Sequence, residues 1–374
     1  MMKHGIKHVI LSLLITASAL YCAAQEVPRE IPKLQHLRAT YDSSYYHSFI
    51  QDIVARFYFS QKFTGPTLKG IGSSDKLRYL PNTTLNMGVG ATYKPITINL
   101  GYGFNFLNQD KEKGKTKYLD LQSHLYVRKW AFDFLGQFYT GYYLLQKDNK
   151  QLEPGAYYIR PDMHVTVIGL AAHRVLNYKK FSYRAAMVQN EYQQKSAGSF
   201  LVGVEAYYGS HTADSAFVPI MLAGKFNQQG VTQIRFLEFG PSLGYAYTLV
   251  VAKHFFATAS LTFTPKFSFA TEHALYTDDA DLHVSIVPGF FVRGAAGYNS
   301  DFWNVNLSFV GNRLITKGTS SSDHYVYNTG NLRLTFAHRL IPGPKLRKKL
   351  NQFDHHFVKN IPIPVDAMQP QKPE

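Results

Sequence analysis

The most constraining feature of this chain is a two-residue alternation of apolar and polar side chains that recurs along its length. From Ile96 to Phe106 every even-numbered position is apolar or aromatic, and every odd-numbered position is small or polar. Successive side chains of a β-strand point to opposite faces, so this run predicts a strand with one apolar and one polar face. The same period returns in residues 257–264 and 303–309. Such repetition predicts an all-β fold, a transmembrane antiparallel β-barrel of the outer-membrane type.

The first 24 residues have the pattern of a secretory signal peptide. A basic start with Lys3 and Lys7 precedes an apolar stretch and then small residues before Gln25. This pattern predicts cleavage near Ala24. Cys22 is the single cysteine of the sequence, so the mature chain is expected to lack disulfides and thiolate metal sites.

The composition fits a barrel better than a helical membrane protein. Hydrophobic residues make up 45% of the chain, yet the mean hydropathy is −0.19. This average is expected when half of each strand faces lipid and half faces the lumen. Beyond Leu20 no stretch approaches the ~20 apolar residues that a spanning helix requires. We therefore expect membrane insertion by strands.

The formal net charge of the whole chain is +15. A basic balance can indicate nucleic acid as a partner, but no nucleic-acid motif accompanies it and the export signal argues against that partner. Contact with outer-membrane lipids and with the phosphates of lipopolysaccharide is the expectation. The alternative is that the Lys and Arg side chains simply solvate loops and a tail.

Alternation and turn residues together predict thirteen strands. Several exceed the ~5–6 residues usual in soluble sheets and match the ~9–11 residues that cross a bilayer at a tilt. The predicted strands cover residues 53–63, 84–94, 96–107, 118–129, 131–145, 162–176, 181–192, 199–209, 232–250, 254–270, 281–298, 302–315 and 325–340.

Tight and long connections alternate along these strands, as in barrels with short periplasmic turns and long outer loops. Because single-chain bacterial barrels have even strand numbers, either Ala216–Phe226 adds a strand and gives fourteen, or one predicted run does not span and leaves twelve. The predicted organisation is a signal peptide (1–24), a periplasmic lead-in without a clear element (25–48), the barrel (49–340) and a basic, Pro-rich periplasmic tail (341–374).

Most charged residues of the predicted strands fall on the face opposite the aromatic side chains. Inside a protein such groups are tolerated when they are paired and hydrogen-bonded. Two interpretations stay open: a charged constriction that selects solutes, or a structural network that fills a narrow pore. The residues predicted to face the lumen are Arg56, Asp120, His124, Asp133, Arg184, Glu205, Arg293 and Arg333.

Four segments carry a family resemblance: Arg-Pro-Asp at 160–162, Phe-Ser-Tyr-Arg at 181–184, residues 189–199 and residues 240–247. Through them the chain resembles an uncharacterised family of exported proteins of Gram-negative bacteria, a domain of unknown function thought to form outer-membrane barrels. The resemblance implies a location and a barrel, and it implies no reaction or ligand. It singles out a candidate functional segment consisting of Arg160, Asp162, Lys195, Ser196 and Ser199.

An enzymatic interpretation draws on the same residues. Some outer-membrane barrels hydrolyse lipids with Ser, His and a carboxylate. Here Ser196 or Ser199 would need a histidine and an acid, for which His124 or His164 and Asp120 or Glu205 are the candidates. No Gly-x-Ser-x-Gly elbow surrounds either serine, and Ala-Gly-Ser also suits a close-packed strand entry.

We therefore expect an outer-membrane barrel without enzymatic activity, metal or cofactor. Its expected role is that of a narrow channel or a structural, lipid-binding envelope protein. The alternatives are a barrel-embedded lipid hydrolase and a secreted soluble β-rich binding protein. Expected partners are outer-membrane lipids, lipopolysaccharide and the barrel-assembly machinery, for which Phe336 is the candidate terminal aromatic residue; no nucleic acid is expected.

Overall fold

A computed structural model describes residues 41–71, 76–94, 96–104, 110–145, 157–275, 281–318 and 324–356, with side chains as far as residue 352. The predicted signal peptide with its cleavage site near Ala24, and the tail beyond residue 356, lie outside the described residues.

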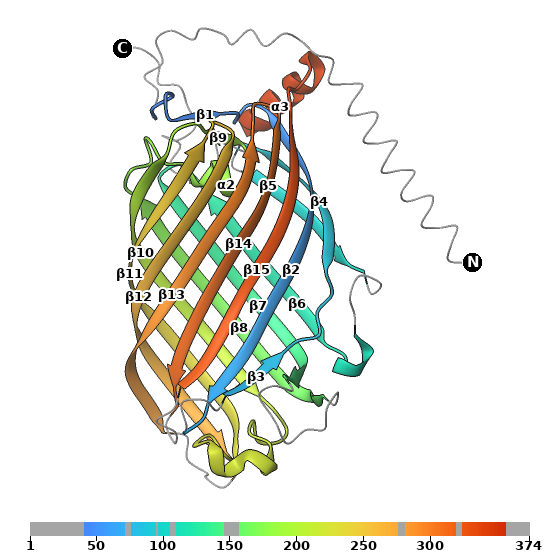
Figure 1. The fold of residues 1–374 in the computed structure, drawn as a ribbon, viewed down its shortest axis with the longest axis vertical. Helices are drawn as coiled ribbons and strands as arrows, with labels where there is room; N and C mark the ends of the chain where they lie inside the picture. The colour runs from blue at the N-terminus through green and yellow to red at the C-terminus, as the bar shows by residue number, and fades with distance from the viewer. Residues whose placement is uncertain are drawn as a thin grey trace, which may run out of the picture.

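The chain folds into an antiparallel β-barrel with tilted strands (Figure 1). Within the described residues its main sheet has thirteen strands, of which ten form a closed ring in the order β2–β15–β14–β13–β12–β11–β10–β8–β7–β3 and back to β2. The predicted fold class is confirmed. The strands are β2 (Ile53–Lys69), β3 (Lys76–Leu80), β4 (Asn86–Tyr93), β5 (Ile96–Gly103), β6 (Lys117–Tyr126), β7 (Trp130–Leu144), β8 (Tyr158–Val175), β10 (Ala197–Thr212), β11 (Val231–Val251), β12 (Phe255–Ala274), β13 (Leu282–Asn299), β14 (Trp303–Lys317) and β15 (His324–Leu340).

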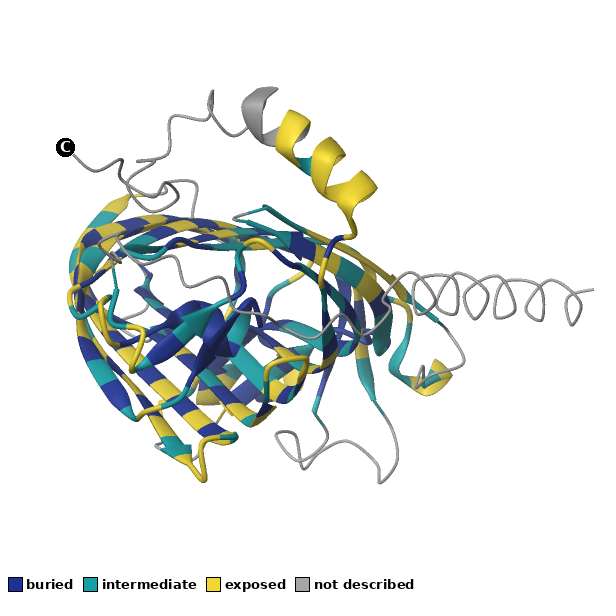
Figure 2. Cartoon of the chain, turned by 90° about the horizontal axis from the view of Figure 1, so that it is seen from above, coloured by how far each residue is buried: buried dark blue, intermediate teal, exposed yellow. Residues whose placement is uncertain are grey.

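The alternation in the sequence becomes a polar inside and an apolar outside. On β12, Thr262, Thr264 and Ser268 are buried, whereas Leu261 and Phe263 are exposed on the outer face. The banding of buried and exposed residues continues around the wall of the barrel (Figure 2). An exposed belt of aliphatic and aromatic side chains is the surface that such a barrel presents to lipid.

Tight turns lie at the end of the barrel where β1 (Tyr46–Ser48), β9 (Glu191–Gln193) and α3 (Pro344–His356) are drawn (Figure 1). In the turn between β11 and β12, Ala252 and Lys253 have φ angles of 48° and 62°. Val251 pairs with Phe255, so the turn has three residues, and two of them adopt the left-handed conformation that favours Asn and Gly. Longer connections join the strands at the opposite end.

The run 181–192 was predicted as a strand, and that prediction is wrong. It holds the helix α2 (Tyr183–Met187) and the short strand β9 (Glu191–Gln193). The Ser182 hydroxyl accepts a hydrogen bond from the backbone N–H of Ala185 and so caps α2, a role that serine fills well. The odd-numbered apolar side chains of this run imitate a strand, but the cap favours a helical turn.

Two further predictions are corrected by the structure. The lead-in was expected to carry no element, yet β1 (Tyr46–Ser48) pairs with β9 across the barrel mouth. Ala216–Phe226 was the optional extra strand, and it holds the 3₁₀ helix η4 (Ile220–Lys225) instead. The sheet therefore has twelve strands of eight residues or more, together with the five-residue β3, which the sequence prediction missed.

The barrel interior is occupied at both ends. The segment of residues 177–198, called the plug below, inserts α2 and β9 at the tight-turn end. Toward the opposite end an aromatic cluster fills the lumen, with Tyr79, Tyr142, Phe217 and Tyr327 almost fully buried, and the largely exposed η4 contributes only its buried Leu222 to this core. The His211 ring stacks on Phe217 with 3.8 Å between ring centroids.

After β15 the chain forms the helix α3 (Pro344–His356), which stands away from the wall of the barrel (Figure 2). Within the described residues, no helix has both the length and the apolar character needed to cross a membrane.

Candidate functional site

The wall of the barrel is interrupted between β5 and β6. Among the described residues, β5 pairs with β4 alone and β6 pairs with β7 alone. The ring closes instead through β3, which bonds to β2 at Thr67–Lys69 and to β7 at Tyr143 and Leu144. We call the unpaired boundary between β5 and β6 the seam. It leaves two strand edges without a partner strand in the tight-turn half of the barrel.

A cavity of about 360 Å³ lies behind the seam. Both edges contribute to its lining, with Ile98 and Asn99 from β5 and Ser123 from β6, and the plug contributes Val188. Several of the polar residues that line this space also keep a buried side-chain atom without a hydrogen-bond partner. These atoms are Arg56 Nε, Arg333 Nε, His124 Nε2, Tyr126 Oη, Gln189 Oε1 and Asn331 Oδ1.

Two arginines give the cavity a positive character. Arg56 is 5% exposed and donates from Nη2 to the Val188 carbonyl at 2.9 Å and to the Thr92 hydroxyl. The guanidinium of Arg333 lies 4.4 Å from the centroid of the Tyr58 ring. Within the described residues, no carboxylate stands among the electrostatic partners of either guanidinium. The two cations therefore line the cavity without a counter-ion among the described residues.

A chain of charged groups runs through the lumen from His124, which lines this cavity. His124 Nδ1 lies 2.6 Å from Asp133 Oδ1, and the other oxygen of Asp133 accepts a hydrogen bond from Arg293. Arg293 reaches His173 Nδ1 at 3.4 Å, and His173 Nε2 lies 3.1 Å from Glu205. Four of the residues predicted to face the lumen, His124, Asp133, Arg293 and Glu205, are thus joined through His173. The sequence prediction did not include His173, although its place on the inner face of β8 could have indicated it.

Asp120 belongs to a separate group lower in the barrel. Its carboxylate binds Lys62 at 3.1 Å, Gln137 at 2.8 Å and the Tyr139 hydroxyl at 2.7 Å. The alternation of the strands predicted Asp120 but not these three partners.

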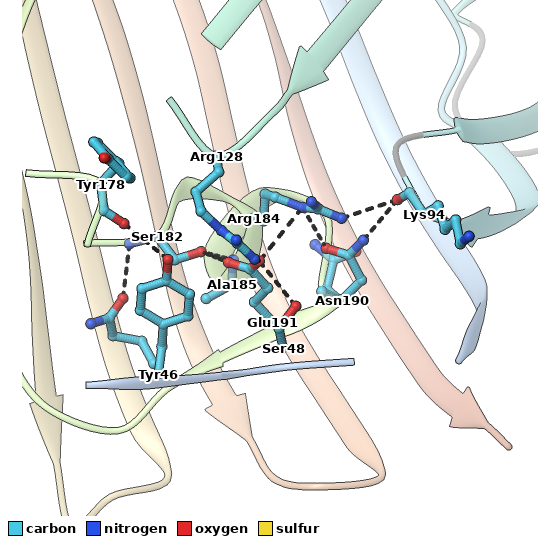
Figure 3. A network of polar contacts seen from close by, with 12 residues as sticks. Tyr46, Ser48, Lys94, Arg128, Tyr178, Ser182, Arg184, Ala185, Asn190 and Glu191 are labelled. Atoms are coloured by element: carbon cyan, nitrogen blue, oxygen red, sulfur yellow. Dashed lines mark hydrogen bonds and ion pairs between the residues drawn. The ribbon is translucent and has the colours of Figure 1, made fainter. Parts of the chain in front are cut away.

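Arg184 was predicted on a strand, and the structure places it on α2 within the plug. Its Nη2 donates to the Lys94 carbonyl at 3.0 Å, in the turn between β4 and β5, and its Nε donates to Asn190 at 3.2 Å (Figure 3). Burial lowers the pKa of this guanidinium, and the carboxylate of Glu191, 3.9 Å away, acts in the opposite direction. Glu191 also accepts hydrogen bonds from Ser182 and from Ser48 of β1, so one network ties the plug to β1 and to the β4–β5 turn.

The Arg-Pro-Asp stretch fastens the outer-loop end of the barrel. Arg160 binds Asp162 through two parallel hydrogen bonds of 2.9 and 2.8 Å. The same guanidinium donates to the carbonyls of Ser215 and Ala216 at 2.9 and 2.8 Å. It thereby holds the start of the connection 213–230 that carries η4.

The serines and the lysine of the candidate functional segment have structural contacts. The Ser196 hydroxyl accepts a hydrogen bond from the N–H of Val250 at 2.9 Å, and the Ser199 hydroxyl accepts one from the N–H of Asn177 at 2.8 Å. The ammonium group of Lys195 lies over the Tyr45 ring. None of these contacts brings a serine to a histidine.

The other histidine considered for catalysis, His164, contacts Thr140 at 2.9 Å on the outer-loop half of the sheet. Across the part of the chain that the structure describes, no group of three or more His, Cys, Asp or Glu side chains could hold a metal ion.

A closed antiparallel ring with a polar interior and an apolar outer face defines a β-barrel of the outer-membrane type. The chain belongs to the family described as "Domain of unknown function (DUF4421)", whose model matches residues 40–339. The comparison with curated proteins finds no match.

Solved outer-membrane proteins resemble this structure weakly. The outer membrane protease OmpT of Escherichia coli is 11% identical with a TM-score of 0.34, covering 79% of this chain and 98% of that one. The toluene transporter TodX of Pseudomonas putida is 6% identical with a TM-score of 0.24, covering 77% of this chain and 90% of that one. What these proteins do is therefore not carried over to this chain.

Proposed function

We propose that this protein is a plugged barrel of the Gram-negative outer membrane that binds a membrane lipid through the seam and does not act as an open channel. Its signal peptide would be cleaved near Ala24 during export. The observation that carries the proposal is the polar cavity directly behind a break in the wall between β5 and β6. Backbone groups without partners are costly in hydrocarbon and are tolerated only where protein or a polar cavity covers them. A lipid whose headgroup enters the seam would cover the unpaired strand edges and would fill the polar cavity behind them.

The filled lumen argues against passive diffusion along the barrel axis. The plug occupies one end, the buried pair of Asp133 and Arg293 crosses the middle, and the aromatic cluster with η4 occupies the other end. Of the two interpretations of the charged lumen, this arrangement favours the structural network. The exposed apolar belt does not support the alternative of a soluble β-rich protein.

Electrical recording in planar bilayers separates a channel from a closed barrel. We expect purified protein to give no stepwise conductance, and a variant in which residues 181–194 are replaced by a short glycine-serine turn to conduct. Native mass spectrometry after mild detergent extraction should find the intact protein with a bound lipid. Steady conductance of the intact protein, or a protein that carries no lipid at any stage of delipidation, would contradict the proposal.

A lipid hydrolase is the second candidate, and one observation favours it. His124 lines the cavity and keeps Nε2 without a hydrogen-bond partner, while Asp133 fixes its Nδ1, which is how a general base is oriented in hydrolases. Release of a fluorescent fatty acid from a labelled phospholipid, abolished in His124→Asn, would support catalysis. Binding of the same phospholipid without turnover would leave the protein as a binder.

A further inference from the structure

We infer that the cavity behind the seam is a site for the phosphate group of a membrane phospholipid, held by Arg56 and Arg333, with the acyl chains leaving between β5 and β6. This inference rests on the proposed function and names the ligand chemistry.

The first argument is charge. Of the residues that line the cavity, two are arginines and none is an Asp or Glu. A buried cation without a counter-ion is strongly disfavoured, so it requires an anion or a hydrogen-bond network that takes its place. Arg56 and Arg333 each keep an Nε–H without a partner, and both line the same space. Guanidinium groups match phosphate oxygens in geometry and charge.

The second argument is access. The plug closes the axial route, because Val188 and Gln189 form part of the cavity lining. The remaining approach is lateral, through the seam, where Leu100 of β5 is 68% exposed and Ile98, which also lines the cavity, is 60% exposed. A free anion would have to cross hydrocarbon to enter there, whereas a lipid already lies in it. The site therefore selects an amphiphile with an anionic group.

The third argument is shape. A cavity of about 360 Å³ is near the lower end of the ~300–1,000 Å³ range of small-ligand pockets, which suits a headgroup but not a whole lipid. On the outer wall an apolar groove begins at Ser123 of β6 and runs past Phe132 and Ala206 to Phe239. Ser123 thus borders both the polar cavity and the apolar groove, so a headgroup and an acyl chain would find continuous surfaces.

The depth of the site indicates which leaflet supplies the lipid. Arg56 lies near the start of β2, and Val188 of the plug lines the same cavity, which places the cavity toward the end with the tight turns; Arg333 lies near the middle of β15, opposite Ser60. Short turns mark the periplasmic end of outer-membrane barrels. We therefore assign the ligand to the periplasmic leaflet.

The test is titration of the delipidated, full-length mature protein in detergent micelles, followed by native mass spectrometry. The probes are dioleoyl-phosphatidylglycerol, dioleoylglycerol with the same chains but no phosphate, and inorganic phosphate. We expect wild-type protein to bind the phospholipid at least tenfold more tightly than the diacylglycerol, and millimolar phosphate to leave lipid binding unchanged. Full competition by inorganic phosphate would overturn the lipid assignment in favour of a free-anion site.

The variants are Arg56→Gln, Arg333→Gln and the double variant, with Arg313→Gln on the exposed face of β14 as the matched control. We expect each single variant to weaken phospholipid binding at least tenfold, the double variant to lose the preference over diacylglycerol, and the control to match wild type. If the double variant binds the phospholipid as wild type does, the arginines do not bind the phosphate, but the proposed lipid binding still holds. If wild-type protein binds no lipid, both proposals fail.

Heat-modifiable migration on gels reports whether each variant folds. A further variant, Asn99→Trp at the mouth of the seam, tests the site without changing either arginine. Asn99 is exposed on β5, so a bulky ring there should block lateral entry and reduce lipid binding at least tenfold in a folded barrel. Unchanged binding in a folded Asn99→Trp variant would overturn entry through the seam.

Discussion

Replacement of Arg293 by methionine should destabilise the barrel through the charge that it leaves behind. Arg293 is fully buried, pairs with Asp133 and lies 4.0 Å from the Phe291 ring centroid. Methionine keeps much of the length and the apolar contact, so the main loss is the counter-ion of a buried carboxylate. Breaking one side of a buried ion pair costs about 3–5 kcal/mol. Because His124 retains its hydrogen bond to Asp133, we expect about 3 kcal/mol, the low end of that range.

The assay is denaturant unfolding of protein refolded into lipid vesicles, followed by loss of heat-modifiable migration and by tryptophan fluorescence. Arg235→Met, on the exposed face of β11, is the matched control and should change stability by less than about 0.5 kcal/mol. The double variant Asp133→Asn, Arg293→Met removes both charges and should recover most of the loss. An Arg293→Met protein within about 1 kcal/mol of wild type, or a double variant no more stable than the single one, would refute the reasoning.

Three further predictions follow from individual contacts. Arg160→Ala should release residues 213–230 and lower the free energy of unfolding by about 3 kcal/mol, because charge-assisted hydrogen bonds contribute about 1.5–3 kcal/mol each. Faster amide hydrogen exchange in that segment would support this prediction, and unchanged exchange would contradict it. Glu191→Gln should weaken the plug by about 2 kcal/mol, seen as brief conductance bursts in bilayers that wild-type protein lacks. Ala252→Asn with Lys253→Gly should raise the stability by about 1 kcal/mol, because other residues in the left-handed conformation cost about 1–2 kcal/mol each, whereas Gly and Asn adopt it readily. A lower midpoint of thermal unfolding would contradict this prediction.

Strand alternation made the barrel predictable, because lipid outside and a polar lumen inside impose opposite demands on successive residues. On β12, for example, Leu261 is exposed and its neighbour Thr262 is buried, as this alternation requires. It also predicted Arg56 and Arg333 as inward-facing, since parity alone decides the face of a strand. The same parity failed for 181–192, where a capped helix carries apolar side chains at every second position.

The seam could not be predicted in this way. Alternation shows which face of a strand is polar, but it carries no information about which edges are bonded. β5 and β6 follow one another in sequence and look like an ordinary hairpin, yet the five residues of β3 take over the pairing between β2 and β7. β3 lies between two polar stretches and is too short to show a period. The cavity therefore follows from a pairing choice that local sequence patterns do not record.

Arg56 both lines the cavity and holds the plug. Its Nη2 donates to the Val188 carbonyl of the plug at 2.9 Å, while its Nε is buried without a hydrogen-bond partner. A phosphate bound by the remaining donors of this guanidinium would leave the contact between Nη2 and the plug in place. Arg184 and Asn190 of the plug meanwhile hold the Lys94 carbonyl in the turn that leads into β5. The plug therefore fixes one edge of the seam, and a barrel loaded with lipid through that seam stays closed to ions.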